Sequence, residues 1–557
     1  EICALLVQRR LLQEGTDFEL ASQGTADVVL ESMSWGVRRG YHARAAAYLE
    51  RTEKASHWEV GQHWSLAGEP EKAGESFLAA AQAALRSYAY EESCRCLQEI
   101  SQLPPLTQPL THWELEELWA DAMLGAGFSL QALEKLIPLS EAADPEPINS
   151  LRRLRKLGSA YETLGRLRES YEANQRGLER QSKLKSRNSE RAQLILEEGL
   201  RLCERQSRVL FLLRPPGWLD DFTHLVVAQM KLAIQRNQNH QESWAQAFIY
   251  GGFWSLRRLK WSGGALLSIN NALSRMVGLP DSESKAQLMG DSGYLMLLSG
   301  STRKAKRVLE DTRDMLNRLG LATGMCKNLL QLHAVCFHQG CVGEAYQHGC
   351  QALQLARRLG NRFEEALALS TITQSSSALG KLEAAETYLS QLEPLREQFQ
   401  ASYMELIAEL AHCYFLWANQ RYQELVQRAT RNYEACKAVQ ELPHQTLHFG
   451  VLALEGQVLL DPAGATGLLR ELNAPTRGQR LFRPIYKRVQ AMALMSEGKR
   501  GKAFDILGEC TRRAEQAGVP WERYRCHGLL AEWLEEEGLG EHHRTEAARA
   551  WKDVLNE

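Results

Sequence analysis

The chain has 557 residues, of which 44% are apolar and 24% are charged, as in an ordinary water-soluble protein. Its formal net charge of −2 excludes a strong overall field, so we expect neither nucleic acid nor an anionic membrane as a partner. The length is too great for one compact core and predicts several domains or an extended array. The longest apolar runs are too short to cross a bilayer, so we expect no membrane span.

The 12 cysteines form no Cys-x-x-Cys pair, and the nearest neighbours are Cys94 with Cys96 and Cys336 with Cys341. We expect them to fill small buried positions on helices as weakly polar residues, not to form disulfides or a metal site. This usage favours a reducing, cytoplasmic location. Because the sequence begins with Glu1 and enters abruptly on an apolar segment, we also expect an upstream part.

The first fifty residues differ from the rest of the chain. We predict a short helix that ends at Gly15, a short strand within residues 16–20, and helices over 26–35 and 38–50. Elsewhere, the alternation of apolar and polar residues that marks a strand is nearly absent. The remainder is therefore predicted to be helical.

A spaced pattern of glycine and alanine runs through the helical part. A Gly that follows an amphipathic helix takes the left-handed conformation that closes it, and the next helix begins two or three residues later. Two antiparallel helices then cross closely where small residues meet, five residues after the Gly and, in two units, seven before it. The turn glycines are Gly68, Gly127, Gly165, Gly300, Gly340, Gly380 and Gly498; the residues five later are Ala73, Ala132, Ser170, Ala305, Ala345, Ala385 and Ala503; the small residues seven before are Gly158 and Gly293.

The spacing of this pattern is forty residues in the most regular part. Gly300, Gly340 and Gly380 follow one another at this interval, and Gln420 falls at the next one. Each helix should then have about 15–18 residues, with short turns between them. Two stretches fit poorly: the Pro-Pro-Gly at 215–217 and the segment 459–479, where a hairpin is shortened and Pro475 ends it. We expect irregularities of the array there, or alternatively a domain break.

The pattern resembles the tetratricopeptide repeat. Its best single unit is LRKLGSAYETLGRLRESYEANQRGL, in which seven positions are in phase: Leu154, Leu157, Gly158, Tyr161, Gly165, Ser170 and Gly177. The resemblance implies an all-α, tetratricopeptide-like superhelical solenoid of helical hairpins, about eleven to thirteen of them. Such arrays present an extended concave surface that holds a protein or peptide segment.

Two further resemblances suggest a parent protein. The order of elements in the first fifty residues resembles the end of a winged-helix subdomain in signalling ATPases of the AAA/STAND type, although FELAS at 18–22 lacks the His that often follows the wing. The stretches 41–50, 63–92, 250–276 and 332–370 resemble the C-terminal region of class III adenylyl and guanylyl cyclases of the soluble adenylyl cyclase kind. These resemblances imply three parts: 1–40 as the winged-helix end, 41–214 as N-terminal repeats and 215–557 as C-terminal repeats. ATP and magnesium would belong to missing upstream domains.

A search for catalytic motifs finds none. The Gly-Lys pairs lack the spacing and the Ser or Thr of a phosphate-binding loop, and there is no HExxH or GxSxG. His57 and His63, each followed by Trp, lack the further ligands of a metal site, and we expect them at the edge of the core. We expect His542 and His543 at the start of a helix.

The basic stretch 151–191 is interleaved with acidic residues. We interpret it as a solvated helix face, or alternatively as a groove for a peptide or acidic partner.

The sequence therefore predicts a non-catalytic sensor or scaffold with no cofactor or metal of its own. Its partner would be a protein or peptide segment in the concave groove, or the upstream ATPase and cyclase domains. Two alternatives stay open: the repeat region of a STAND ATPase transcription regulator, and a free-standing tetratricopeptide adaptor. Thirteen residues are predicted to be structural, at repeat turns and helix crossings: Gly68, Ala73, Gly158, Gly165, Gly293, Gly300, Ala305, Gly340, Ala345, Gly380, Ala385, Gly498 and Ala503.

Overall fold

The computed structural model describes residues 12–14, 18–20, 32–52, 56–142, 146–185, 188–215, 218–235, 241–258, 261–399, 402–438, 443–477, 479, 481–517, 519–535 and 538–555. The chain divides into two compact units, Glu1–Ala126 and Gly127–Glu557. The predicted divisions at 40/41 and 214/215 stay predictions, and the second of them falls inside the second unit. Within the described ranges, no helix combines the length and the apolar character needed to cross a membrane.

The described residues of the first unit form one short strand pair and five α-helices. Its elements are β1 Leu12–Glu14, β2 Phe18–Leu20, α3 Trp35–Leu49, α4 His57–Ala67, α5 Pro70–Arg86, α6 Tyr90–Gln102, the 3₁₀ turn η1 Pro105–Thr107 and α7 His112–Ala126. Consecutive helices pack against each other around a core that includes Trp64, Phe77 and Leu97. Helix α4 begins with a capping box, in which the Ser56 hydroxyl accepts from Glu59 N and the Glu59 carboxylate accepts from Ser56 N.

The two strands pair antiparallel, with Leu12 opposite Leu20 and Glu14 opposite Phe18. The predicted strand is confirmed over 18–20, and the predicted helix over 38–50 is confirmed by α3. The predicted helix ending at Gly15 is wrong over 12–14. Leu-Gln-Glu has good helix propensity, but a partner strand a few residues away satisfies its backbone groups instead. The predicted helix over 26–35 lies mostly outside the described residues, as does most of the winged-helix assignment over 1–40.

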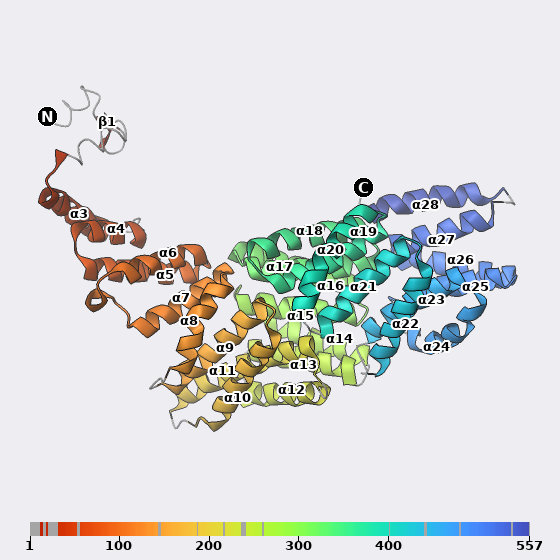
Figure 1. The fold of residues 1–557 in the computed structure, drawn as a ribbon, viewed down its shortest axis with the longest axis horizontal. Coiled ribbons are helices and arrows are strands. Elements are labelled where there is room, and N and C mark those ends of the chain that lie inside the picture. Colours follow the sequence, from red (N-terminus) through yellow and green to blue (C-terminus); the bar gives the residue numbers. More distant parts are fainter. Residues whose placement is uncertain are drawn as a thin grey trace. The chain divides into compact units, whose positions relative to one another are not determined.

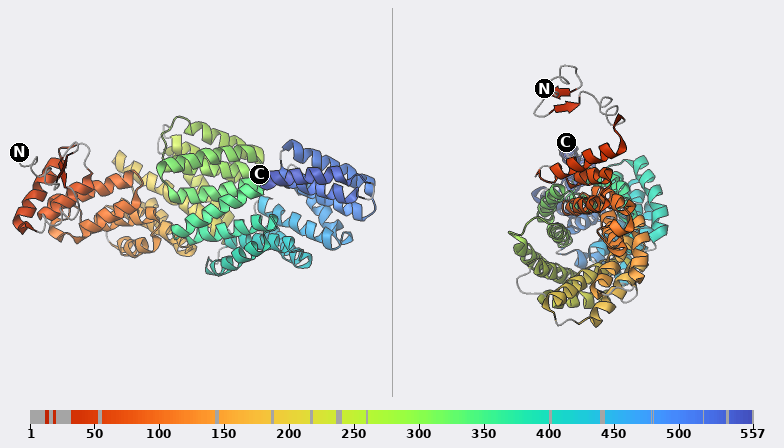
Figure 2. Two further views of the ribbon diagram at one scale, coloured as in Figure 1. Left: turned by 90° about the horizontal axis from the view of Figure 1, so that it is seen from above. Right: turned by 90° about the vertical axis from the view of Figure 1, so that its left-hand side faces the viewer.

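The second unit is an array of helical hairpins, which confirms the predicted all-α, tetratricopeptide-like fold. Figure 1 shows successive hairpins stacked side by side, and the left view of Figure 2 shows the same stacking from above. The helices are α8 Ser129–Glu141, α9 Pro147–Thr163, α10 Leu167–Lys183, α11 Ser189–Leu213, α12 Trp218–Gln235, α13 Gln241–Arg258, α14 Ser262–Met276, α15 Glu283–Leu298, α16 Thr302–Leu319, α17 Ala322–Gln339, α18 Val342–Arg358, α19 Arg362–Ala378, α20 Leu382–Phe399, α21 Ser402–Ala418, α22 Tyr422–Ala438, α23 Pro443–Leu460, α24 Thr466–Thr476, α25 Arg483–Ser496, α26 Arg500–Ala517, α27 Pro520–Trp533 and α28 Gly540–Leu555, with the 3₁₀ turn η2 Ala463–Ala465.

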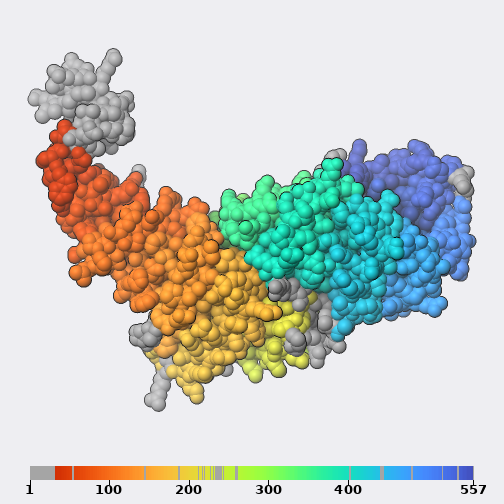
Figure 3. All heavy atoms as spheres, viewed as in Figure 1, coloured from red at the N-terminus to blue at the C-terminus, as the bar shows by residue number. Residues whose placement is uncertain are grey.

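The odd-numbered helices from α13 to α27 pack against one another as the inner row of this array. Each is followed by an even-numbered helix that packs on it from outside. Figure 3 shows that hairpins from distant parts of the second unit meet on the face seen there, where the orange segment borders the green one. The inner row brings side chains from many hairpins to one concave face.

The turn and crossing residues occupy the following places. Six turn glycines have φ between 72° and 82°, which an L side chain rarely adopts: Gly68, Gly165, Gly300, Gly340, Gly380 and Gly498. Five alanines are fully buried: Ala73, Ala305, Ala345, Ala385 and Ala503. Two of the predicted glycines lie inside helices, Gly158 in α9 and Gly293 in α15. A Cβ at Gly293 would lie 2.7 Å from Cγ of Leu309, and one at Gly158 would meet the side chain of Asn174.

Where the forty-residue stride reaches Gln420, a non-glycine residue takes the same left-handed conformation, with φ of 57°. The segment 459–479 contains a short hairpin, because α24 has only 11 residues and ends at Thr476, directly after Pro475. At the other irregular place, α11 runs for 25 residues and ends at Leu213, and Arg214 is left-handed. Helix α12 begins at Trp218 and packs against α11, so the chain continues as a hairpin there.

The array also makes contacts between hairpins that are far apart in sequence. Helix α9 packs against α19, α11 packs against α21, and α28 packs against α18. In Figure 1 the C-terminus accordingly lies beside α18 to α20. In an ordinary solenoid each repeat contacts only its neighbours. Here both ends of the second unit fold back onto its middle hairpins and enclose the concave face.

Candidate functional site

The concave face of the second unit holds two adjoining cavities. The cavity nearer α11 has a volume of about 290 Å³ and is lined mainly by α11, α13, α15, α17, α19, α21 and α23. The cavity nearer α27 has a volume of about 430 Å³ and continues along α17, α21, α23, α25 and α27. Phe337, His338 and His448 line both. The two cavities therefore adjoin along the inner helices, and together we call them the groove.

Aromatic side chains supply much of the apolar surface of the groove. Tyr250 and Phe253 come from α13, Tyr294 from α15, Phe337 from α17 and Tyr403 from α21, and all five are half-buried. They come from successive inner helices because each of these helices turns the same face inward. Half-buried rings spaced along a groove are suited to receive the apolar side chains of a bound chain.

The end of the groove nearest α11 carries buried charges. Arg208 lies between two carboxylates, 2.5 Å from Glu162 and 3.6 Å from Glu364, so α11 is tied to both α9 and α19. Proximity to Glu162 raises the pKa of Arg208 above its ordinary value. Burial raises the pKa of Glu364, and Oε2 of this carboxylate is buried without a hydrogen-bond partner among the described residues. An acceptor left in this state is available to a ligand.

The opposite end is built around Arg488, whose side chain is fully buried. Its Nη2 donates to Glu455 Oε2 at 3.0 Å and its Nε donates to Glu522 Oε2 at 2.9 Å. Arg525 donates to Glu455 Oε2 at 3.3 Å, and Trp417 Nε1 donates to Oε1 of the same carboxylate at 3.0 Å. Burial raises the pKa of Glu455, but Arg488 and Arg525 outweigh it and hold that pKa well below its usual range. The network joins α21, α23, α25 and α27.

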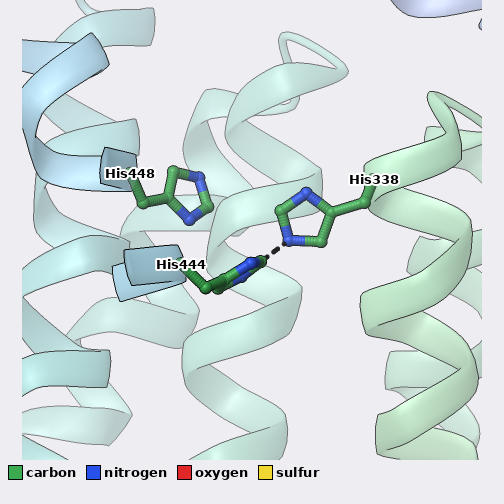
Figure 4. Close-up of side chains that lie close together, drawn as sticks. All are labelled: His338, His444 and His448. Carbon is green, nitrogen blue, oxygen red and sulfur yellow. Dashed lines mark hydrogen bonds between the residues drawn. The ribbon is translucent and has the colours of Figure 1, made fainter. Parts of the chain in front are cut away.

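Three histidines meet where the two cavities join. His338 comes from the last turn of α17, and His444 and His448 lie one turn apart on α23; Figure 4 shows the three rings facing one another. The Nε2 atoms of His338 and His444 are 3.1 Å apart and share a hydrogen bond, and the Tyr414 hydroxyl lies 2.7 Å from Nε2 of His448. Burial lowers the pKa of His444 to about 4 and that of His448 to about 3. All three imidazoles are therefore neutral at neutral pH, since the pKa of His338 is also well below its ordinary value through burial and its two neighbours.

The histidines discussed from sequence lie elsewhere. His57 is exposed at the start of α4, and His63 is half-buried with its Nδ1 at 2.9 Å from Nδ1 of His42. Neither belongs to a cluster of three possible metal ligands among the described residues. His542 and His543 lie in the first turn of α28, which confirms the predicted helix start, and His543 contacts His527 of α27.

The basic stretch 151–191 is only partly a solvated face. Arg153 and Lys156 are buried, 4% and 8% exposed, and Arg155 Nε donates to Glu198 of α11 at 2.8 Å. The prediction of a solvated face is wrong for this part of α9, because α11 packs against it and brings carboxylates to the charges.

Two of the predicted turn residues, Gly300 and Gly340, lie at the rim of the larger cavity.

The described cysteines number 11, and all of them are free. Eight are buried, as expected from the sequence: Cys96, Cys203, Cys326, Cys336, Cys413, Cys436, Cys510 and Cys526. Burial raises the thiol pKa of Cys96 to about 11 and that of Cys203 to about 12, and the pKa of Cys526 is raised first by a hydrogen bond with Cys510 and then by burial. They act as small core residues, not as nucleophiles.

Apart from Gly300 and Gly340 at the rim, the sequence patterns predict none of the groove residues. Glu455 and Arg488 are 33 residues apart, and His338 is 106 residues from His444. The one available signal was the spacing of His444 and His448, four residues apart on a helix, which places both rings on one face. Their third partner could not be found without knowing which inner helix lies opposite.

No family model matches the sequence, and the search of curated proteins finds no relative. Several helical proteins of known structure are similar to it at low identity. A Rap protein complexed with Competence and Sporulation Factor is 13% identical, with 76% of this chain and 99% of that chain covered and a TM-score of 0.43. A Signal Transduction ATPase with Numerous Domains from Pyrococcus horikoshii, with a tetratricopeptide repeat sensor, is 12% identical, with 84% and 60% covered and a TM-score of 0.34. The APC/C hetero-tetramer Cut9–Hcn1 is 14% identical, with 88% and 97% covered and a TM-score of 0.36. Scores this low carry no inference about function, and the description of the fold rests on the helices of this chain.

Proposed function

We propose that the groove of the second unit binds an extended peptide or a segment of a partner protein, and that the chain acts as a scaffold or sensor. The observation that carries this proposal is that two adjoining cavities follow one another along the inner helices. A groove lined by successive helices and furnished with half-buried aromatic rings is suited to a chain-like ligand more than to a compact small molecule.

The chemistry of the lining suggests what such a ligand carries. Apolar side chains would occupy the spaces between the aromatic rings. Backbone or side-chain donors would satisfy buried acceptors that have no hydrogen-bond partner among the described residues, such as Glu364 Oε2 and Gln445 Oε1. A ligand with both features gains affinity by burying its apolar side chains and by donating hydrogen bonds to acceptors that water reaches poorly.

The two ends of the groove differ in charge, which suggests a direction for the ligand. The cavity near α11 has three carboxylates and two cationic side chains in its lining: Glu204, Asp291, Glu364, Arg208 and Lys327. The cavity near α27 has four cationic side chains and two carboxylates: Arg303, Lys304, Arg488, Arg525, Glu455 and Glu522. Of these, Arg303 and Lys304 are exposed at the rim. We expect a basic residue of the ligand near α11 and an acidic residue near α27.

A random peptide library selected on the purified chain tests the proposal. Enriched peptides are labelled, and their affinity is measured by fluorescence anisotropy for the unchanged chain and for Leu367→Arg, which places a long charged side chain in the groove. The matched control is Leu267→Arg, the same change at a site that is 62% exposed on α14. We expect at least about a tenfold loss of affinity for Leu367→Arg, equal to 1.4 kcal/mol, and no loss for the control. Equal affinities for the two variants would contradict the proposal.

We further propose that this chain is the C-terminal regulatory part of an ATPase-linked signalling protein, most specifically a class III nucleotide cyclase. The support is the resemblance of the stretches quoted above, together with the strand pair β1–β2 ahead of α3, which is suited to the wing of a winged-helix subdomain. The coding sequence upstream of Glu1 tests it. A Walker motif with a cyclase Asp pair supports a cyclase, a Walker motif alone supports a STAND ATPase regulator, and neither supports a free-standing adaptor.

We also propose that the chain itself is not an enzyme, since its groove supplies binding surface and paired charges instead of an activated nucleophile. Purified chain incubated with ATP, GTP and magnesium should form neither inorganic phosphate nor cyclic nucleotide above a buffer blank. Turnover that copurifies with the chain and scales with its concentration would contradict this.

A further inference from the structure

The histidines at the junction of the two cavities form a compact set of nitrogen donors. One candidate ligand atom from each of His338, His444 and His448 lies within 4.8 Å of the other two. The set joins α17 to α23, while α19 and α21 lie between these helices in the inner row. It therefore spans the groove and does not belong to a single hairpin (Figure 4).

The spacing of two of these nitrogens is that of ligands on one metal ion. Two nitrogens bound to the same tetrahedral zinc ion lie about 3.3 Å apart, because each Zn–N bond is about 2.0–2.1 Å long. The Nε2 atoms of His338 and His444 are 3.1 Å apart. Only a small movement of the rings would place an ion between them.

The third histidine has the support that metal-bound imidazoles need. Such a ring normally donates its second nitrogen to an oxygen nearby, which fixes its orientation. The Tyr414 hydroxyl, 2.7 Å from Nε2 of His448, is placed for this role when Nδ1 binds the ion.

We propose that His338, His444 and His448 bind a divalent transition-metal ion of the zinc class, which bridges α17 and α23 across the middle of the groove. Three imidazoles and no carboxylate favour Zn²⁺, Co²⁺, Ni²⁺ or Cu²⁺ over Mg²⁺ and Ca²⁺. Because His338 and His448 line both cavities, the fourth coordination position faces the groove and takes water or a donor group of a ligand.

The bound ion fixes the distance between α17 and α23 and so sets the width of the groove where its two halves meet. This goes beyond the proposed peptide binding and does not depend on it, because the ion binds whether or not a peptide does. A second cluster, Cys336 with Glu344 and His348, is the nearest competitor. Its carboxylate already accepts a hydrogen bond from Lys306 at 2.7 Å, which commits it to an ion pair.

Titration of the full chain, freed of any polyhistidine tag, with Co²⁺ and Zn²⁺ tests the site. Co²⁺ should give the intense visible absorption of a four- or five-coordinate ion with a stoichiometry of one, and Zn²⁺ should displace it. His444→Gln should weaken Zn²⁺ binding by at least about tenfold in calorimetry, the lower end of what loss of even a supporting residue costs. Hydrogen exchange in α17 and α23 should slow on adding Zn²⁺ to the unchanged chain only.

The matched control is His527→Gln, because His527 is also buried and also contacts a second histidine, His543, at 2.9 Å, yet it belongs to no three-ligand cluster among the described residues. This variant should keep the affinity of the unchanged chain, and circular dichroism should show both variants folded. No absorption from Co²⁺, or equal Zn²⁺ affinity in His444→Gln and the unchanged chain, would overturn the proposal. Binding that survives His444→Gln but is lost in Glu344→Gln would assign the ion to the second cluster and would also overturn it.

Discussion

The helix crossings and the groove lining of the second unit differ in how their buried residues are spaced along the sequence. At the crossings, Ala305, Ala345 and Ala385 are fully buried at a constant stride, and each meets a helix only a few residues away in sequence. In the groove, Arg488, Glu455 and Glu522 are also buried, yet they come from three hairpins at intervals of 33 and 34 residues, which do not match the forty-residue stride of the crossings. The repeat pattern thus reports contacts that hold hairpins together, and it carries no information about what the groove binds.

The largest expected effect is a loss of stability on changing a residue of the groove. It would show that the groove lining, and not only the helix crossings, holds hairpins together. Arg488→Ala leaves Glu455 and Glu522 buried without their shared partner, and breaking a buried ion pair costs about 3–5 kcal/mol. Urea unfolding should report this loss, and hydrogen exchange should localise it to α23, α25 and α27. The control is Arg421→Ala, which removes an exposed pair with Glu424 and should leave the unfolding midpoint unchanged. If the two variants unfold alike, the buried network does not stabilise the array.

A smaller effect is expected at a crossing. Ala345→Leu inserts three carbons where the side chain is fully buried, and overpacking of this kind costs about 1–3 kcal/mol. Thermal unfolding should detect it, while peptides bound by the folded chain should keep their affinity. Gln351→Leu, an equally apolar change at an exposed position of the same helix, should be close to neutral. A loss of peptide affinity without a loss of stability would mean that residues at the helix crossings also determine what the groove binds.

The smallest effects sharpen the role of the turn glycines. At Gly380 and at Gly508 an added Cβ would meet no atom within 4 Å, so packing is matched, but only Gly380 has a positive φ, 72°. Gly380→Ala should destabilise by about 1–2 kcal/mol, because the left-handed conformation is costly for an L side chain. Gly508→Ala, inside α26, should stabilise by about 0.5–1 kcal/mol. The unfolding midpoints should therefore move in opposite directions, and a common direction would refute the backbone explanation.

Much of the hairpin array was predictable because its signals are local. A turn glycine, a small residue five positions later and an amphipathic helix on each side lie within one hairpin, so the sequence alone locates each of them. The forty-residue spacing also places a turn at Gln420. The chain takes the left-handed conformation there although the residue is not a glycine. The predicted short hairpin within 459–479 likewise follows from Pro475, because proline limits helices locally, whereas residues 216–217 of the other predicted irregularity lie outside the described residues.

The failures involve partners that are distant in sequence. Strand β1 was mistaken for a helix because its pairing with β2 outweighs the propensity of Leu-Gln-Glu. Arg153 and Lys156 were interpreted as solvated because nothing near them reveals that α11 packs against α9. The candidate metal site was missed because His338 is on a different hairpin from His444.

The sequence by itself determined that this protein is a stack of helical hairpins, since helix length, turn and crossing are decided by residues a few positions apart. Only the tertiary structure decided that α9, α11 and α28 fold back onto α18, α19 and α21, and that the inner helices bring arginine, glutamate and histidine side chains into one groove. The physical reason is distance along the chain. Charge pairing and metal coordination act over a few ångströms in space, between residues whose separation in sequence no local pattern records.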